Sequence, residues 1–188
     1  MRLARASIAT QGAESSYKNL PDEPVDHALG HSRGGWTTKI HTLTDELTAP
    51  VTWLLSPGQA GDNPYLSPLL LAHRDQRAQQ DQARAFRLLA DKAYSHDSTR
   101  TMLRSQRIAH TIPQRSDQIA RRKAKGSKGG RPPSFDPEIY RKRNAVERGY
   151  ARLKQWRAIA TRYDKYAMTY RGGVALAVIA IFYRTRPN

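Results

Sequence analysis

Residues 136–165 read DPEIYRKRNAVERGYARLKQWRAIATRYDK and predict the best-defined element of the chain. Asp136 is a favourable N-cap, and Pro137 suits the first position of a helix. Glu138 adds a negative charge in the first turn, where the helix dipole favours it. We therefore expect one helix over residues 136–160. Its apolar stripe would dock on a sheet and consists of Ile139, Val146, Tyr150 and Leu153.

Four polar side chains lie on the neighbouring face of this expected helix. At about 100° per residue they fall within a stripe about 60° wide, and they are Tyr140, Arg143, Glu147 and Lys154. A carboxylate held among cations at the edge of a buried face suits a metal ligand that works on phosphates. An ordinary ion pair between Glu147 and Arg143, four residues apart, explains the same spacing.

Upstream of this helix, the chain alternates between strand and helix patterns. Such alternation favours an α/β layer arrangement. Two candidate strands flank the turn residues Asp45 and Glu46 and predict a hairpin, and a later short apolar run ends at Asp91. The expected strands cover residues 37–44, 49–56, 87–90 and 108–113, and the expected helices begin at Pro64 and cover about 97–106.

Three other segments have distinct compositions. Residues 1–35 are polar and turn-rich and predict a loop or tail ahead of a domain over 36–188. Residues 115–135 predict a mobile basic loop, whose flexible cations suit phosphates rather than bases. Residues 166–184 predict a last helix, and its apolar run of ten residues is too short for a bilayer, which needs about 20. The loop cations that we expect to bind DNA are Lys123, Lys125, Lys128 and Arg131.

The positive charge of the chain lies in its second half. Residues 1–99 carry 10 basic and 11 acidic side chains, whereas residues 100–188 carry 22 basic and 5 acidic ones. This asymmetry indicates a surface that faces a polyanion. A basic but merely soluble surface, or RNA binding, is the alternative that charge alone leaves open.

Other residue types limit the function further. The chain has no cysteine, which excludes a disulfide framework and a cysteine zinc site and suits the cytoplasm. Its six histidines form no cluster with metal-ligand spacing. Three aromatic residues near the C-terminus can stack on bases, but their helical spacing favours a place in the core. They are Trp156, Tyr163 and Tyr166.

The segment YRKRNAVERGYARLKQWRAIATRYDK resembles the Tyr-Arg-Glu-Lys signature of a large group of insertion-sequence transposases of the acidic-triad (DDE) class. Upstream, LLADKAY resembles the second-acid motif of the same group. The segments DHALGHSRGGWTTKIH, PGQAGDNP and KGSKGGRPP also resemble family segments, so the resemblance covers about residues 17–184 in order.

This resemblance implies a ribonuclease H-like catalytic domain that cuts and joins double-stranded DNA with two Mg²⁺ or Mn²⁺ ions. By analogy, Asp91 and Glu147 are catalytic metal ligands, Arg143 and Lys154 orient DNA, and Tyr140 supports the helix or touches the backbone. The resemblance also implies a bacterial cytoplasmic protein that associates with the nucleoid and forms a homo-oligomer when active.

The sequence departs from the family at the first acid of the triad. The family carries it on an opening strand, and this chain has no apolar strand ending in Asp before residue 37. Asp22 and Asp26 lie in a proline-containing polar stretch, and Asp45 lies in a turn. We therefore expect a fold that is incomplete at its N-terminal strand and a chain that does not cleave DNA alone. It would be a remnant that binds DNA as an inhibitor, or the partner of an upstream-frame polypeptide.

Overall fold

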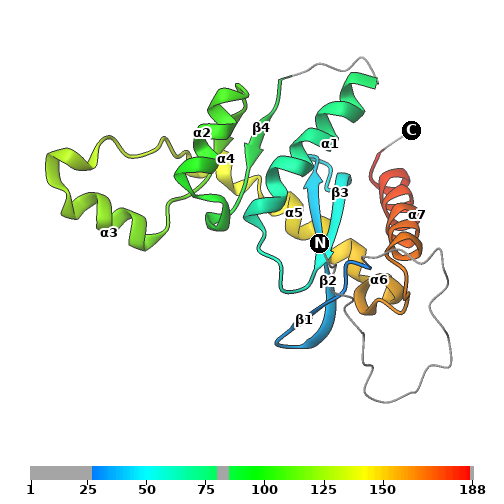
Figure 1. Ribbon diagram of the computed structural model, residues 1–188. Helices are drawn as coiled ribbons and strands as arrows, with labels where there is room; N and C mark the ends of the chain where they lie inside the picture. Colours follow the sequence, from blue (N-terminus) through cyan, green and yellow to red (C-terminus); the bar gives the residue numbers. More distant parts are fainter. Residues whose placement is uncertain (1–26, 80–84, 187–188) are drawn as a thin grey trace.

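The computed structural model describes residues 27–79 and 85–186. Within these residues the protein is mixed α/β (Figure 1). Three antiparallel strands form one sheet in the order β1-β2-β3, and two parallel strands form a second sheet. The strands are β1 (Gly30–Ser32), β2 (Gly35–Thr44), β3 (Pro50–Pro57), β4 (Arg87–Leu89) and β5 (Ala109–Thr111).

The expected hairpin is confirmed as β2 and β3, which pair with Ile40 opposite Leu55. Asp45 closes its turn, because the Asp45 carboxylate accepts a hydrogen bond from the Ala49 backbone N–H at 2.9 Å.

Strand β1 was not expected, since three residues are too few to show an alternating pattern. Gly35, with a φ of 100°, allows the tight turn from β1 into β2. Residues 1–26 of the expected tail lie outside the described residues.

The second sheet shares a hydrophobic core with two helices. Helix α1 (Leu66–Gln79) follows the short 3₁₀ helix η1 (Asn63–Tyr65), and α2 (Asp97–Ser105) follows η2 (Lys92–Tyr94). Helices α1 and α2 fall where the sequence placed helices, η1 coincides with the expected helix start at Pro64, and η2 was not expected. The buried apolar side chains of this cluster are Leu66, Leu70, Leu88, Ala90, Leu103 and Ile112, and Leu43 of β2 packs against them.

The prediction of one continuous helix over residues 136–160 is wrong. The segment forms α4 (Pro137–Arg141), α5 (Asn144–Lys154) and α6 (Arg157–Thr161). Helix α5 ends because Trp156 adopts an extended conformation, which redirects the chain into α6. Helix α5 packs closely on the hairpin, where a methyl group on Gly149 would lie 3.0 Å from the Thr48 carbonyl oxygen.

Helix α7 (Ala167–Thr185) confirms the expected last helix and is uninterrupted at Gly172–Gly173. The apolar run within it is buried on one side only, because Leu176, Ile179 and Tyr183 are exposed. Among the described residues, no helix is long and apolar enough to cross a membrane. The buried side packs into a second core, with Ala49, Leu153, Ile159, Tyr170, Val174, Ala177, Val178 and Ile181.

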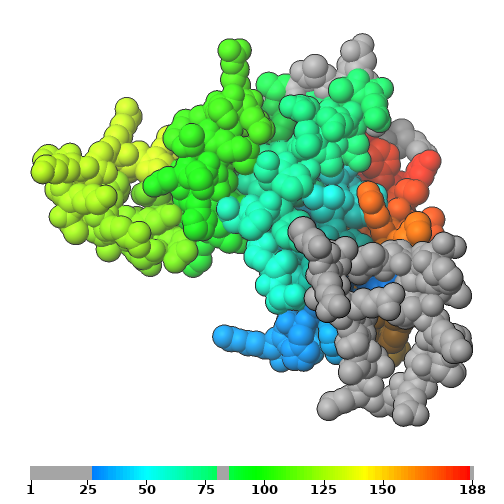
Figure 2. Space-filling view, in the orientation of Figure 1, coloured from blue at the N-terminus to red at the C-terminus, as the bar shows by residue number. Residues whose placement is uncertain are grey.

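The expected basic loop contains a helix and a 3₁₀ turn. Helix α3 (Ser116–Ala124) and η3 (Gly126–Gly129) form a basic lobe that projects from the rest of the molecule (Figures 1 and 2). Glycine, serine and proline suggested a loop, but α3 begins with a favourable cap, since the Gln118 side chain accepts from the Arg115 backbone N–H at 3.1 Å. The Gln118 amide also donates to the Ser95 carbonyl oxygen at 3.2 Å and so anchors the lobe.

Candidate active site

Asp91 lies where the sequence placed it, at the end of a short strand. It follows β4 and caps η2, where its Oδ1 accepts a hydrogen bond from the Ala93 backbone N–H at 2.8 Å. Leu88 and Ala90 are buried in the core on either side of this strand end. The strand therefore fixes the backbone of Asp91, while its half-buried carboxylate keeps an oxygen for another ligand.

Glu147 lies in the first turn of α5 and forms the ion pair that its spacing allowed. Arg143 Nη2 donates to Glu147 Oε1 at 2.5 Å. The Glu147 side chain is 60% exposed, so it lies further from the buried face than the expected continuous helix placed it. The Arg143 guanidinium also lies 5.6 Å from the centre of the Tyr140 ring, which holds α4 against the start of α5.

Arg143 connects the two predicted acids electrostatically. Burial disfavours its charge, but the hydrogen bond to Glu147, the nearby Tyr140 and the charge of Glu147 outweigh that cost and raise the pKa of Arg143, and the charge of Asp91 adds the smallest of these contributions. The tertiary structure thus brings Asp91, Glu147, Arg143 and Tyr140 into one region, although Asp91 comes from a different part of the chain.

A third carboxylate, Asp62, belongs to the same region and was not predicted. Burial raises the pKa of Tyr94 far above its ordinary value, and the negative charges of Asp62 and Asp91 raise it further. The phenol of Tyr94 therefore stays protonated in the field of both acids and can act as a hydrogen-bond donor. The sequence signal was the segment PGQAGDNP, where Asp62 follows a strand and precedes a helix.

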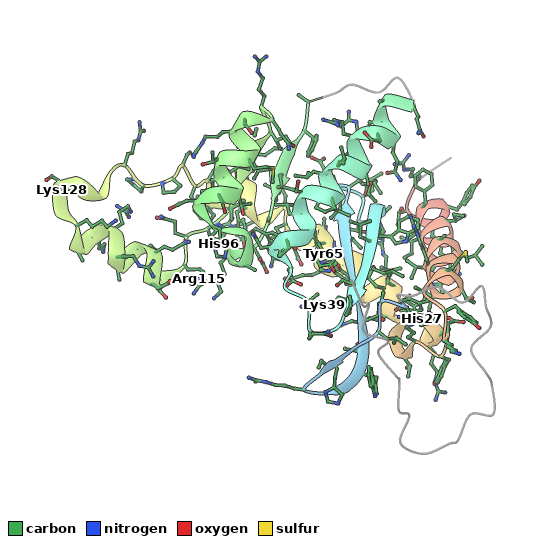
Figure 3. The ribbon with its side chains drawn as sticks, in the orientation of Figure 1. His27, Lys39, Tyr65, His96, Arg115 and Lys128 are labelled. Atoms are coloured by element: carbon green, nitrogen blue, oxygen red, sulfur yellow. The ribbon has the colours of Figure 1, made fainter. Side chains whose placement is uncertain are left out.

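Asp62 is held by β2. Lys39 Nζ donates to Asp62 Oδ1 at 3.0 Å and to the Ala60 carbonyl oxygen at 2.7 Å. His41 stacks on Tyr65 with ring centres 4.4 Å apart, and its Nδ1 lies 3.9 Å from Asp62 Oδ1. Figure 3 labels Lys39 and Tyr65 in this region. The carboxylate is thus oriented by a lysine and a histidine of one strand.

Ser56, His41 and Asp62 are the residue types of a hydrolase triad, but the Ser56 hydroxyl is not accessible to a substrate. His41 Nε2 lies 2.7 Å from Ser56 Oγ. Ser56 is only 1% exposed and His41 only 5%, so a substrate cannot reach the hydroxyl. Burial lowers the pKa of His41 more than Asp62 raises it, which keeps the ring neutral in a structural network.

The remaining predicted residues lie apart from this region or face solvent. Lys154 is exposed at the end of α5. Lys123, Lys125 and Lys128 are exposed in the basic lobe, and Arg131 is exposed just beyond it. The core interpretation of the aromatic residues is wrong for Trp156 and Tyr163, which are exposed. Each lies at the edge of a short helix, where helical spacing does not determine burial.

The donor atoms fit a hard divalent cation in kind but are few in number. Carboxylate oxygens are the ligands that Mg²⁺ prefers. Among the described residues, however, no three histidine or acidic side chains lie close enough together to hold a metal ion. Asp91 and Glu147 each already accept a hydrogen bond.

Comparison with known proteins identifies the class. The chain matches the family model of the transposase DDE domain over residues 11–182. It belongs to this family, and membership supports a role in DNA transposition.

The chain is also similar to a particular transposase of an insertion sequence. The chain is 29% identical over 148 residues to the putative transposase for insertion sequence element IS6501 of Brucella ovis (strain ATCC 25840 / 63/290 / NCTC 10512). The matched region covers 79% of this chain and 99% of that relative. No solved structure matches the chain.

Proposed function

We propose that this chain takes part in metal-dependent phosphodiester cleavage and strand transfer at the ends of an insertion sequence, on a ribonuclease H-like framework. The observations that support this most are the position of Asp91 at the end of β4 and the 2.5 Å pair of Glu147 with Arg143, a cation whose pKa the charge of Asp91 also helps to raise. Two acids from distant segments that act on one cation indicate a common site.

In this proposal Asp91 and Glu147 hold Mg²⁺ or Mn²⁺. Two such ions would activate the attacking oxygen and stabilise the leaving oxygen of an in-line displacement. Arg143 offers a planar fork for a phosphate, and Tyr140 limits the directions that the fork can take. Lys154, exposed on the same helix as Glu147, adds a point charge for the DNA backbone.

We further propose that the chain does not cleave DNA alone. Its two acids need another carboxylate, and Asp62 is engaged by Lys39. Within the described residues the two sheets are separate, so β4 pairs with β5 on one side only and β2 lacks a strand along residues 38–44 on the side of β1. Unpaired strand edges are templates for an added strand. An upstream-frame polypeptide that supplies a strand and an acid would complete the site, and the active form would be a homo-oligomer.

The test is nicking of duplexes that carry the element ends, in Mg²⁺ or Mn²⁺. We expect no nicking by the chain alone, and nicking after addition of the upstream-frame polypeptide. Asp91→Asn and Glu147→Gln should each abolish it. Asp75→Asn, which removes an exposed acid of α1, is the matched control. Nicking by the chain alone that Glu147→Ala abolishes would overturn the requirement for a partner, and nicking that survives Glu147→Gln would overturn the site.

The charge distribution supports a second candidate function, that of a non-catalytic inhibitor. Residues 100–188 carry the whole excess of positive charge, which is enough for DNA binding without catalysis. Such a protein would occupy element ends and reduce the activity of intact transposase. The double variant Asp91→Asn/Glu147→Gln should then inhibit as well as the wild type, whereas a complementing partner would depend on both acids.

A further inference from the structure

A cavity of about 1030 Å³ lies between α2 and the basic lobe. Of the described residues that line it, seven are lysine or arginine and a single one, Asp97, is a carboxylate. Arg104, Arg122 and Lys125 line this cavity and form no ion pair with any described residue. So many uncompensated cations around one hollow repel one another unless anions enter it.

The base of the cavity is fixed by buried contacts. Arg100 is 3% exposed, and its Nη2 donates to the Ile112 carbonyl oxygen at 2.8 Å. The bond from Gln118 to the Ser95 carbonyl oxygen joins α3 to the segment that leads into α2. Both walls are thus tied to the core, and the hollow is present before any ligand arrives.

One shielded donor at the hollow has no acceptor among the described residues, and the helix end beside it carries no side-chain cap. Arg122 Nε is shielded from solvent and lacks a hydrogen-bond partner among the described residues. His96, at the N-cap of α2, makes no capping hydrogen bond with its side chain. The N-terminus of α2 also carries partial positive charge. Figure 3 shows His96 on the α2 side of this region and Lys128 at the far end of the basic lobe.

We propose that this cavity binds the phosphodiester backbone of double-stranded DNA between α2 and the basic lobe. The proposal takes its ligand from the proposed function, but it adds α2 to the DNA-binding surface and assigns the contact to one cavity. The lining is rich in charged and amide donors, which suits phosphates, and Phe135 is its single aromatic residue among those described. The bound strand would be positioned without being read, since phosphate contacts carry no sequence information.

The absence of cysteine allows a direct test by single-cysteine labelling. Ser98 and Ser105 are both exposed on α2, but only Ser98 lines the cavity. A 20-bp duplex should slow maleimide labelling of Ser98→Cys at least tenfold and leave Ser105→Cys unchanged. Inorganic phosphate at the same phosphate concentration should protect neither, which separates a DNA backbone from a free anion. Equal protection of both cysteines, or protection by phosphate alone, would overturn the proposal.

Salt dependence of duplex binding gives an independent measurement. Each lost phosphate contact lowers the slope of log K against log salt by about 0.9. We expect Arg104→Gln/Arg122→Gln to lower the slope by about 1.8 and the affinity at 0.1 M salt by roughly 60-fold. The single variant Arg104→Gln is compared with Arg74→Gln, which removes one positive charge from an exposed position of α1 outside the cavity. An equal effect of Arg74→Gln and Arg104→Gln would show that general charge is responsible and overturn the cavity.

The outcomes also separate this proposal from the proposed function. If the wild type binds duplex while Ser98→Cys stays reactive, the cavity proposal fails and the catalytic proposal stands. If nicking fails in every combination while Ser98→Cys is protected, the catalytic proposal fails and the cavity stands. If the chain binds no duplex, the cavity proposal fails, and nicking with the upstream-frame polypeptide decides the catalytic proposal separately.

Discussion

In the body of the molecule, two clusters of buried apolar side chains join the sheets to the helices, whereas none of residues 116–129 of the basic lobe is buried. The lobe is held by a helix cap and by one amide hydrogen bond to Ser95. The buried clusters of the body can therefore hold the acids in fixed positions. The lobe has no buried side chains to stabilise it, and it exposes its positive charges to solvent. Substitutions should separate these properties, because stability lies in one region and phosphate affinity in the other.

The largest effect is expected from the core. Leu153 is 1% exposed and packs among Ala49, Ile159 and Val174. Leu153→Ala should lower the free energy of unfolding by about 2–5 kcal/mol, because it removes buried surface and leaves a cavity. Urea denaturation measures this. Ile119→Ala in the lobe is the control and should cost less than about 1 kcal/mol; a loss as large as that of Leu153→Ala would show that the lobe has a core role.

A smaller effect is expected from pH through His41. Burial depresses its pKa in the folded state, so the unfolded chain binds the proton more readily. The stabilising contribution is present above about pH 6.5, the unfolded value, and is lost as pH falls below it. His41→Gln should reduce the slope of unfolding free energy against pH by up to about 1.4 kcal/mol per unit. Burial also lowers the pKa of His73, so part of the slope should remain; an unchanged slope would mean that His41 is protonated in the fold.

A local effect is expected at Gly129, where the turn of the lobe touches its helix. A methyl group there would lie 2.1 Å from the Arg122 carbonyl oxygen, so η3 cannot keep its place against α3. Gly129→Ala should speed hydrogen exchange over residues 116–129 and change the unfolding free energy of the body by less than about 0.5 kcal/mol. Ser127→Ala, at an exposed position of the same turn, should change neither.

The smallest effect on stability is expected from the exposed lysines. Replacing Lys123, Lys125 and Lys128 by alanine should change the unfolding free energy by less than about 0.5 kcal/mol per site. Duplex binding should weaken about equally on any sequence, because phosphate contacts are not sequence-specific. A loss confined to one sequence would assign base contacts to the lobe.

Local sequence pattern was enough to predict several features of the chain. The hairpin of β2 and β3, the strand that leads to Asp91 and the concentration of cations after residue 100 all follow from the sequence, since each depends on neighbouring residues. So does the ion pair of Glu147 with Arg143, which one turn of helix brings together. The family resemblance rested on these same residues.

Tertiary structure alone decided the rest. Helical spacing predicted one long helix, but the chain divides into α4, α5 and α6, and α5 lies close to the hairpin at Gly149. The joint effect of Asp62 and Asp91 on the pKa of Tyr94, and the cationic cavity between α2 and the basic lobe, involve segments that are distant in the sequence. Burial of this kind depends on which surfaces meet in three dimensions, and a one-dimensional pattern does not contain that information.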